Sequence, residues 1–428
     1  MANDALRGRG AGQAKVAGRR RWWIAAAVLA MLLAGLAIAR LGLVGQKGAT
    51  VTQAVPTNVG LSASPVAGAT RVDYARLDAR IHLLMQAPDM VGLAVGTVEN
   101  GRVRFARGYG EVLAGSGEAV TPDTVFRWGS VSKGVASSLI VQLAARDKLS
   151  LDAPVASLGT SLRLPGDAAG VTVADILSHR TGLVRNAWDD RLEQGEDPAA
   201  IRAAYASLTA LCKPGTCHAY QNIAYDTATE IVERASGQSY AAAAHDRLFA
   251  PLGMASASVS RAGLERSSSW ARPHRLGRRP TAVNDIYYRV PAAGGVNSSI
   301  GDLVRWMRAQ MGAAPGVLSP AMLETLHAPR VYTPPRGPRA AMDRALTDPQ
   351  YGLGWRSFTY QGHRLVGHRG TVDGYGSLIL FDPAQKSGIV MLWNCNWHRA
   401  ARLQLEFFDM LYGLPPTDWL ALDELTKR

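Results

Sequence analysis

Cysteine is scarce in this chain, which contains only three among 428 residues. So few cysteines exclude a small scaffold held together by disulfides. The sequence also lacks zinc-finger, RNA-recognition and basic-zipper patterns, and its nine histidines do not have the spacing of metal ligands. We therefore expect no nucleic-acid partner, no metal and no cofactor. A hydrophobic fraction of 47% excludes a chain that is mostly disordered and is sufficient to form a buried core.

The net charge of +13 is concentrated at the N-terminus, where seven lysines and arginines and a single aspartate lie within the first forty residues. An apolar run, WWIAAAVLAMLLAGLAIA, covers residues 22–39, and a helix of that length nearly spans a hydrocarbon core about 30 Å thick. Most of these positive charges precede the run, so the positive-inside rule places residues 1–21 in the cytoplasm and the remainder outside. We expect an uncleaved, single-pass anchor in a bacterial cytoplasmic membrane.

Two other interpretations of this segment stay open. A cleaved signal peptide would use Ala37-Ile38-Ala39 as its cleavage site, and the arginines at 19–21 also permit a twin-arginine signal. All three interpretations place most of the chain outside the cytoplasm. The predicted parts are a basic cytoplasmic tail (1–21), an anchor or signal segment (22–44), a linker (45–70), a main folded domain (71–415) and a C-terminal tail (416–428).

Hydrophobic periodicity predicts helices and strands in a mixed order within the main domain. A helix is expected in 71–86, followed by a hairpin whose turn is Glu99-Asn100-Gly101. The middle of the domain, about 131–310, has mostly helical patterns. A second hairpin is expected in 378–394 and a closing helix in about 398–414. Strands at both ends of the domain predict an α+β fold, with an antiparallel sheet flanked by helices and a mainly helical subdomain.

The segment FRWGSVSK contains the pattern Ser-x-x-Lys at Ser130 and Lys133. Residues three apart on a helix share a face, so Lys133 is expected to reach the Ser130 hydroxyl and take its proton. A helix N-terminus just after Gly129 would stabilise a developing oxyanion. A surface serine and a solvated lysine give the same pattern, and about one chance match is expected in a chain of this length. The position on a helix right after the first hairpin favours the chemical interpretation.

Two further segments carry groups suited to this chemistry. Tyr220-Gln221-Asn222 offers a tyrosine that would shuttle protons beside a lysine and an asparagine that would orient it. A half-buried loop tyrosine with a turn asparagine gives the same pattern. The segment 367–371 (GHRGT) predicts an edge strand whose glycine lets a substrate backbone approach. A lone histidine in such a place, His368 here, is more often structural than catalytic.

In this order the three motifs resemble those of the serine β-lactamase-related superfamily of penicillin-recognising hydrolases. The similar branch contains class C β-lactamases, serine D-alanyl-D-alanine carboxypeptidases, D-aminopeptidases and related esterases. Further stretches that are similar to segments of this family are ILSHRTGL (176–183), APLGM (250–254), AGGVNS (293–298) and YGLGW (351–355). The resemblance covers about residues 75–412 and implies a β-lactamase/penicillin-binding-protein-like fold.

The resemblance also implies roles for individual residues. Ser130 would attack an acyl carbonyl to form an acyl-enzyme, with Lys133 as the base and Tyr220 handling the proton for the leaving group. Asn222 would contact the substrate amide. The backbone N–H groups of Ser130 and Thr371 would form the oxyanion hole.

The third motif departs from the lactamase pattern, because His368-Arg369-Gly370 stands where those enzymes have Lys-Thr-Gly. This departure favours a peptidase or esterase that acts on D-amino-acid peptides or esters over a true β-lactamase. A β-lactamase or D-alanyl-D-alanine carboxypeptidase is the nearest alternative, and Arg369 would supply positive charge if it faced the cleft. A third hypothesis is a penicillin-binding-like module that binds or regulates without turnover. The expected partner is a small-molecule or peptide acyl substrate, including one derived from the cell wall.

Two of the three cysteines enclose a Pro-Gly turn, in the sequence CKPGTC from Cys212 to Cys217. Such a turn can bring two Cα atoms within the 4.4–6.8 Å that a disulfide requires, and an oxidising compartment outside the cytoplasm would permit the bond. It would brace the loop that leads to Tyr220. Two buried free thiols are the alternative. Cys395, at the end of an apolar strand, is expected to be a buried thiol.

Overall fold

The computed structural model describes residues 70–334 and 341–422. The predicted cytoplasmic tail (1–21), the anchor (22–44) and the linker up to residue 69 lie outside the described residues. Within the described part of the chain, no helix is long and apolar enough to cross a membrane.

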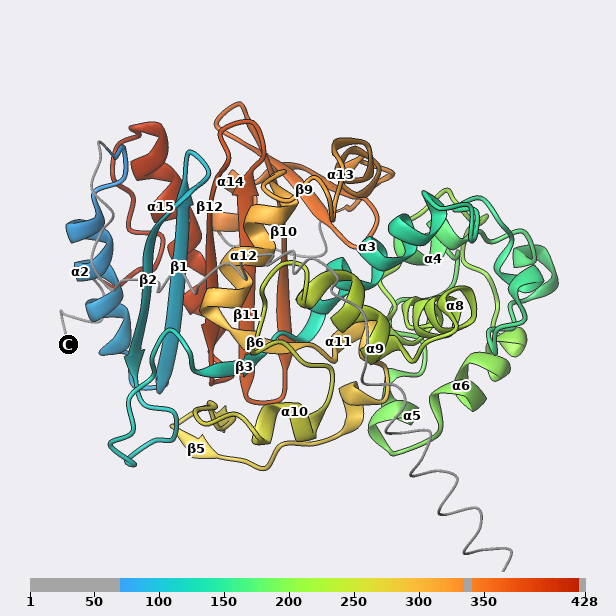
Figure 1. The fold of residues 1–428 in the computed structure, drawn as a ribbon, viewed down its shortest axis with the longest axis horizontal. Helices are drawn as coiled ribbons and strands as arrows, with labels where there is room; N and C mark the ends of the chain where they lie inside the picture. Colours follow the sequence, from blue (N-terminus) through green and yellow to red (C-terminus); the bar gives the residue numbers. More distant parts are fainter. Residues whose placement is uncertain (1–69, 335–340, 423–428) are drawn as a thin grey trace, which may run out of the picture. The chain divides into compact units, whose positions relative to one another are not determined.

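An antiparallel sheet of eight strands forms the body of the fold (Figure 1). Its strands, in spatial order, are β2 (Arg102–Gly110), β1 (Gly92–Glu99), β12 (Ser387–Trp393), β11 (Tyr375–Asp382), β10 (His363–Val372), β9 (Arg356–Tyr360), β8 (Thr347–Tyr351) and β7 (Val331–Tyr332). The first and last strands of the domain therefore meet inside one sheet, near its β2 edge, where β1 pairs with β12. This pairing holds the two ends of the folded chain together and agrees with the predicted fold class.

Both predicted hairpins are present in the sheet. Asn100 and Gly101 connect β1 to β2 with φ angles of 51° and 74°. Two successive residues with positive φ are what a tight two-residue hairpin turn requires, which explains why asparagine and glycine occur there. The second hairpin joins β11 to β12 and pairs Phe381 with Gly388.

Helices cover both faces of the sheet (Figure 1). These helices are α12 (Ile300–Gln310) on one face, and α2 (Tyr74–Met85) and α15 (Leu403–Tyr412) on the other. Successive side chains of β12 point to opposite faces of the sheet and are buried on both. Val390 and Leu392 belong to the core cluster that includes α12, and Ile389 and Met391 belong to the cluster that includes α2 and α15. The predicted opening helix is α2. The predicted closing helix consists of a 3₁₀ turn at His398–Arg402 followed by α15.

Packing continues past residue 415, where a C-terminal tail was predicted to begin. Leu420 and Leu422 are buried in the cluster of α2 and α15. Arg80 on α2 forms an ion pair with Asp418. The described part of the predicted tail, residues 416–422, is therefore packed against this face of the fold.

A mainly helical subdomain is inserted between β3 and the last strands (Figure 1). The chain enters it through the 3₁₀ turn η1 (Gly129–Ser132) and the long helix α3 (Lys133–Ala144), which packs against α8 and α11. Its further helices are α4 (Val173–Leu177), α5 (Asp189–Glu193), α6 (Pro198–Ala204), α7 (Asn222–Tyr225), α8 (Thr227–Ser236), α9 (Tyr240–Ala244) and α11 (Pro291–Gly294).

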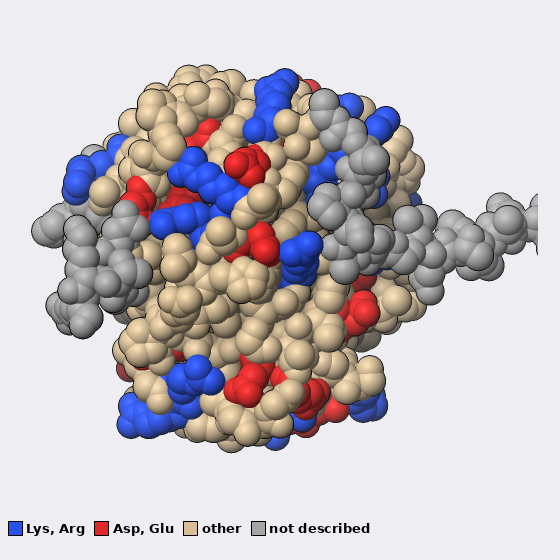
Figure 2. All heavy atoms as spheres, turned by 90° about the vertical axis from the view of Figure 1, so that its left-hand side faces the viewer, with Lys and Arg blue, Asp and Glu red and all other residues tan. Residues whose placement is uncertain are grey.

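Short elements complete the described fold. They are the strand pairs β3 (Val125–Arg127) with β6 (Asn297–Ser299) and β4 (His274–Arg275) with β5 (Arg279–Pro280), and the helices α10 (Arg261–Glu265), α13 (Pro320–His327) and α14 (Ala341–Ala345). On the face shown in Figure 2, the basic and acidic side chains of the described residues are interspersed.

Candidate active site

Ser130 lies in η1, the turn that leads directly into α3. Two glycines allow this turn to lie against strand β10. Gly129 has a φ of 51°, and a Cβ atom there would lie 2.9 Å from the backbone of Thr371. A Cβ atom at Gly370 would lie 2.0 Å from the carbonyl oxygen of Trp128. The contact with η1 therefore excludes a side chain at Gly370. The sequence analysis gave a different reason for a glycine in this segment, the approach of a substrate backbone.

The third motif lies on β10, which is an interior strand of the sheet rather than the predicted edge strand. Among the described strands, β11 pairs with 366–372 of β10, whereas β9 pairs only with 363–367. From His368 onward β10 therefore has a strand neighbour on one side only. The prediction is wrong for the strand as a whole, but the segment with the motif does present a free edge.

Three predicted residues meet at the Ser130 hydroxyl. Lys133 Nζ lies 3.3 Å from Ser130 Oγ, and the Tyr220 hydroxyl donates to the same oxygen at 2.8 Å. Lys133 is fully buried and also donates to Asn222 Oδ1 at 2.8 Å and to the Ala293 carbonyl at 2.9 Å. The turn η1, the helices α3, α7 and α11, and the residue Tyr220 just before α7 thus hold one amine and one phenol at the serine.

Both the oxygen and the nitrogen of the Asn222 side-chain amide form hydrogen bonds within the protein. Its oxygen accepts from Lys133, and its nitrogen donates to Asp189 Oδ2 at 2.9 Å. Burial raises the pKa of Asp189 above its usual value. In this arrangement Asn222 orients the lysine. Its amide nitrogen has a second hydrogen and its oxygen a second lone pair, so the bonds to Asp189 and Lys133 do not exclude the predicted contact with a substrate amide.

His368 belongs to a chain of hydrogen bonds through Tyr351 and His179. Its Nε2 lies 3.0 Å from the Tyr351 hydroxyl, which lies 3.2 Å from His179 Nε2. Since His179 Nδ1 accepts from the Gln221 N–H, its Nε2 carries the proton and donates to Tyr351. Tyr351 then donates to His368 Nε2, and His368 Nδ1 donates to the Arg369 carbonyl at 2.7 Å. Both nitrogens of His368 are therefore engaged.

Burial keeps both histidines of this chain neutral. It lowers the pKa of His368 well below the usual value, and the positive charges of Arg356 and Lys133 act in the same direction. Burial also lowers the pKa of His179 well below the usual value. A neutral His368 whose two nitrogens are already bonded is poorly placed to take a proton from Ser130.

A pocket of about 290 Å³ opens beside Tyr220 and His368. Arg185, Arg356 and Arg369 contribute to its lining. Arg369, which follows the motif histidine, therefore lies at this pocket, whose lining includes Tyr220 and His368 but not Ser130. Three guanidinium groups around a space next to the site favour an anionic occupant.

The charge of these arginines is only partly compensated. Arg369 Nη1 lies 3.5 Å from Asp343 Oδ1. The guanidinium of Arg356 lies 5.2 Å from the ring centre of Tyr351. Within residues 70–334 and 341–422, neither Arg185 nor Arg356 forms an ion pair with a carboxylate. The pocket therefore carries net positive charge.

The structure places Cys212 and Cys217 in a disulfide with a Cα–Cα distance of 6.4 Å. The loop they close is tied to the segment that carries His179, because the Gly215 N–H donates to the Arg180 carbonyl at 2.8 Å, and just after the loop the Ala219 N–H donates to the His179 carbonyl. Cys395 is a buried free thiol, and burial raises its pKa to about 11.

Several neighbours of the site were not singled out from the sequence. These are Asp189, Ala293, His179 and Tyr351. The last three lie in stretches that resemble family segments, so that resemblance was an available signal, whereas nothing around Asp189 forms a motif. Among the described residues, no group of three or more histidines, cysteines, aspartates or glutamates is arranged to hold a metal ion.

Comparisons with known proteins agree with this geometry. The chain is 28% identical over 322 residues to the unguisins hydrolase ungD' of Aspergillus campestris, which covers 72% of this chain and only 59% of that protein. It is 28% identical over 362 residues to penicillin-binding protein 4 of Amycolatopsis lactamdurans, which covers 80% of this chain and 90% of the relative. The octameric penicillin-binding protein homologue from Pyrococcus abyssi has a similar fold, with a TM-score of 0.72, 24% identity and coverage of 81% and 79% of the two chains.

A model of the Beta-lactamase family matches residues 77–405, which is most of the sequence and includes every residue of the candidate site. The chain belongs to the Beta-lactamase family.

Proposed function

We propose that this protein is a serine hydrolase that cleaves amide or ester bonds through an acyl-enzyme on Ser130. The observation that carries the proposal is the convergence of a buried amine, Lys133 Nζ, and a phenol, Tyr220, on the Ser130 hydroxyl. A serine hydroxyl becomes a nucleophile when a neighbouring base removes its proton. The names of the relatives, a hydrolase and a penicillin-binding protein, support the same class of reaction.

In the proposed reaction Ser130 Oγ bonds to the acyl carbon while its proton passes to Lys133 Nζ, which acts as the base. The bond to the leaving group then breaks as Tyr220 gives its proton to the departing nitrogen or oxygen, and the proton on Lys133 restores the Tyr220 hydroxyl. Water then attacks the acyl carbon, its hydroxide portion leaves with the acyl group, and its remaining proton restores the Ser130 hydroxyl. Lys133 and Tyr220, which both contact Ser130 Oγ, relay these protons.

The negative charge on the carbonyl oxygen requires donors that are fixed in advance. We assign this role to the backbone N–H groups of Ser130 and Thr371. The tight contact between η1 and β10 supports the assignment, because a Cβ atom at Gly129 would lie 2.9 Å from Thr371 N and one at Gly370 would lie 3.0 Å from Ser130 N. Replacing either glycine would force these two donors apart.

For the substrate we propose a D-amino-acid peptide or ester. The pocket with Arg185, Arg356 and Arg369 favours an acyl donor with an anionic group, such as a free carboxylate, near the bond that is cleaved. That observation keeps the second candidate open, a D-alanyl-D-alanine carboxypeptidase or a β-lactamase, since both act on carboxylate-bearing compounds. A module that binds such compounds without turnover is the third candidate, and the complete set of catalytic groups argues against it.

We further propose that the protein acts outside the cytoplasm, held by the anchor predicted at residues 22–44. The disulfide between Cys212 and Cys217 supports an oxidising compartment. Retention of the intact chain in washed membranes, with its original N-terminus, would support the anchor, whereas a soluble form that begins near residue 40 would establish cleavage.

Mass spectrometry of the purified protein after incubation with a fluorophosphonate, and separately with a penicillin, tests the proposed reaction. We expect a covalent adduct on the peptide that contains Ser130, and none in Ser130→Ala. A penicillin adduct that decays with time would indicate turnover, and a permanent one would favour the binding module. Absence of any fluorophosphonate adduct on folded wild-type protein would refute a nucleophilic Ser130.

A further inference from the structure

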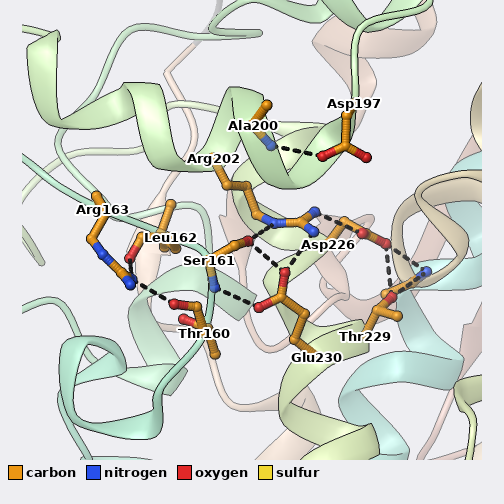
Figure 3. Close-up of polar contacts among 11 residues, drawn as sticks. Thr160, Ser161, Leu162, Arg163, Asp197, Ala200, Arg202, Asp226, Thr229 and Glu230 are labelled. Atoms are coloured by element: carbon orange, nitrogen blue, oxygen red, sulfur yellow. Dashed lines mark hydrogen bonds and ion pairs between the residues drawn. The ribbon is translucent and has the colours of Figure 1, made fainter. Parts of the chain in front are cut away.

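The helical subdomain contains a buried polar cluster (Figure 3). At its centre is Arg202 of α6, which is 5% exposed. Its guanidinium donates to Asp226 Oδ2 at 3.0 Å, to Glu230 Oε1 at 2.7 Å and to Ser161 Oγ at 2.7 Å. One guanidinium group thus holds two carboxylates at the start of α8, as the close-up shows.

Asp226 and Glu230 differ in their other hydrogen-bond partners. Asp226 Oδ1 accepts from the backbone N–H of Ala292 at 3.0 Å. The next residue, Ala293, offers the carbonyl that accepts from Lys133 Nζ. The backbone N–H of Asp226 also donates to the Asn222 carbonyl at 3.0 Å. Asp226 therefore fixes the two segments from which Lys133 receives its acceptors, Ala293 and Asn222.

Glu230 has no such connection to α11. It accepts from the backbone N–H and the hydroxyl of Ser161 and from Arg202. Both carboxylates share the same arginine, so they contribute to the same ion-pair network, but only Asp226 contacts the backbone that holds the lysine. This difference separates a positioning role from a merely structural one.

Stability alone does not account for the pair of Arg202 and Asp226. Asp226 is 1% exposed, and the cost of removing both charges from water offsets much of their attraction. We propose that Asp226, held in place by Arg202, is a positioning residue that fixes the Ala293 carbonyl and thereby holds Lys133 Nζ at the Ser130 hydroxyl. This inference rests on the proposed function, in which Lys133 is the base.

The test compares Asp226→Ala, Asp226→Asn and the matched control Glu230→Gln. Each variant is treated with a small fluorophosphonate at pH 8, and the maximal rate constant of Ser130 labelling is separated from the binding constant of the probe. We expect Asp226→Ala to lower the rate constant about 10- to 100-fold, because small displacements of a catalytic group have effects of that order. Asparagine keeps an acceptor for the Ala292 N–H, so Asp226→Asn should recover part of the rate. The binding constant should stay the same.

Glu230→Gln is expected to lose unfolding free energy as Asp226→Asn does, since each weakens the same Arg202 network, but to label at the wild-type rate. Urea unfolding of all variants supplies the stability comparison, and rates are compared at equal folded fractions. Equal loss of labelling in the Asp226 and Glu230 variants, or wild-type labelling in Asp226→Ala, would overturn the positioning role while leaving the serine hydrolase intact. An unreactive wild type would refute the proposed function and the positioning role with it.

Discussion

Alanine substitutions at Lys133 and His368, made one at a time, identify the group that activates Ser130. Lys133 Nζ lies 3.3 Å from Ser130 Oγ, whereas the two nitrogens of His368 are engaged by Tyr351 and the Arg369 carbonyl. A positioned general base contributes about 10²- to 10⁴-fold to a rate. We therefore expect Lys133→Ala to lower the rate of Ser130 labelling by about that factor, and His368→Ala to lower it far less.

Both substitutions also cost stability, which has to be measured separately from reactivity. Lys133→Ala leaves Asn222 Oδ1 and the Ala293 carbonyl without their buried donor, at about 1–3 kcal/mol for each acceptor. His368→Ala leaves the Tyr351 hydroxyl without its acceptor, at a similar cost for one group. If stability alone controlled labelling, the losses in rate would follow the losses in unfolding free energy.

The assay is the time course of fluorophosphonate labelling, read by intact mass, with urea unfolding of each variant measured in the same buffer. Ser130→Ala serves as the unreactive control. Labelling that vanishes in His368→Ala while it survives in Lys133→Ala would refute this reasoning. The site would then be a histidine-activated hydrolase, and the bonds of His368 to Tyr351 and Arg369 would have to be rearranged in the active enzyme.

Further predictions concern the pocket, the buried carboxylate and the disulfide. Arg356→Gln should lower kcat/KM about tenfold for an acyl donor with a carboxylate, since a charged hydrogen bond contributes about 1.5–3 kcal/mol. The kcat/KM for a neutral ester should not change. An equal loss for both substrates would contradict an anion-binding pocket. Burial raises the pKa of Asp226 to about 7, above the pKa of this carboxyl in the unfolded chain. Between about pH 4 and 7 the folded protein therefore binds this proton more strongly than the unfolded chain does. The unfolding free energy should fall as the pH rises through this range, by at most about 1.4 kcal/mol per pH unit. Urea unfolding across this range should show a flatter slope in Asp226→Asn, and an unchanged slope would refute the assignment. Replacing both Cys212 and Cys217 by serine should lower the unfolding free energy by about 2 kcal/mol, the chain-entropy value for so short a loop, and should abolish any effect of reducing agent on stability.

Elements that depend on nearby residues could be predicted from the sequence. The apolar stripe of Leu77, Ile81 and Leu84 predicts α2, and these three side chains are buried in it. The Asn100-Gly101 turn is a local backbone requirement. The interior position of β10 depends instead on its pairing with β9 and β11. Such pairing is not encoded in the short segment that carries the motif, so an edge strand was predicted.

The same distinction applies to the candidate site. Ser130 and Lys133 are three residues apart, so one helical turn was enough to relate them. The contact between Lys133 and Ala293 joins residues 160 positions apart, and that between Asn222 and Asp189 joins residues 33 apart. Neither contact leaves a local pattern, because a backbone carbonyl can belong to any residue and a single aspartate has no companion motif.

The charges around the third motif explain why a histidine suits it. Position 368 is 5% exposed and lies within electrostatic reach of Lys133 and Arg356. A lysine there would add an ammonium group to a buried region beside the Arg356 guanidinium, which desolvation and like-charge repulsion both disfavour. The neutral imidazole of His368 avoids this cost and accepts the hydrogen bond of Tyr351. Positive charge for an anionic substrate group is instead available at the pocket, where Arg356 and Arg369 keep part of their contact with solvent.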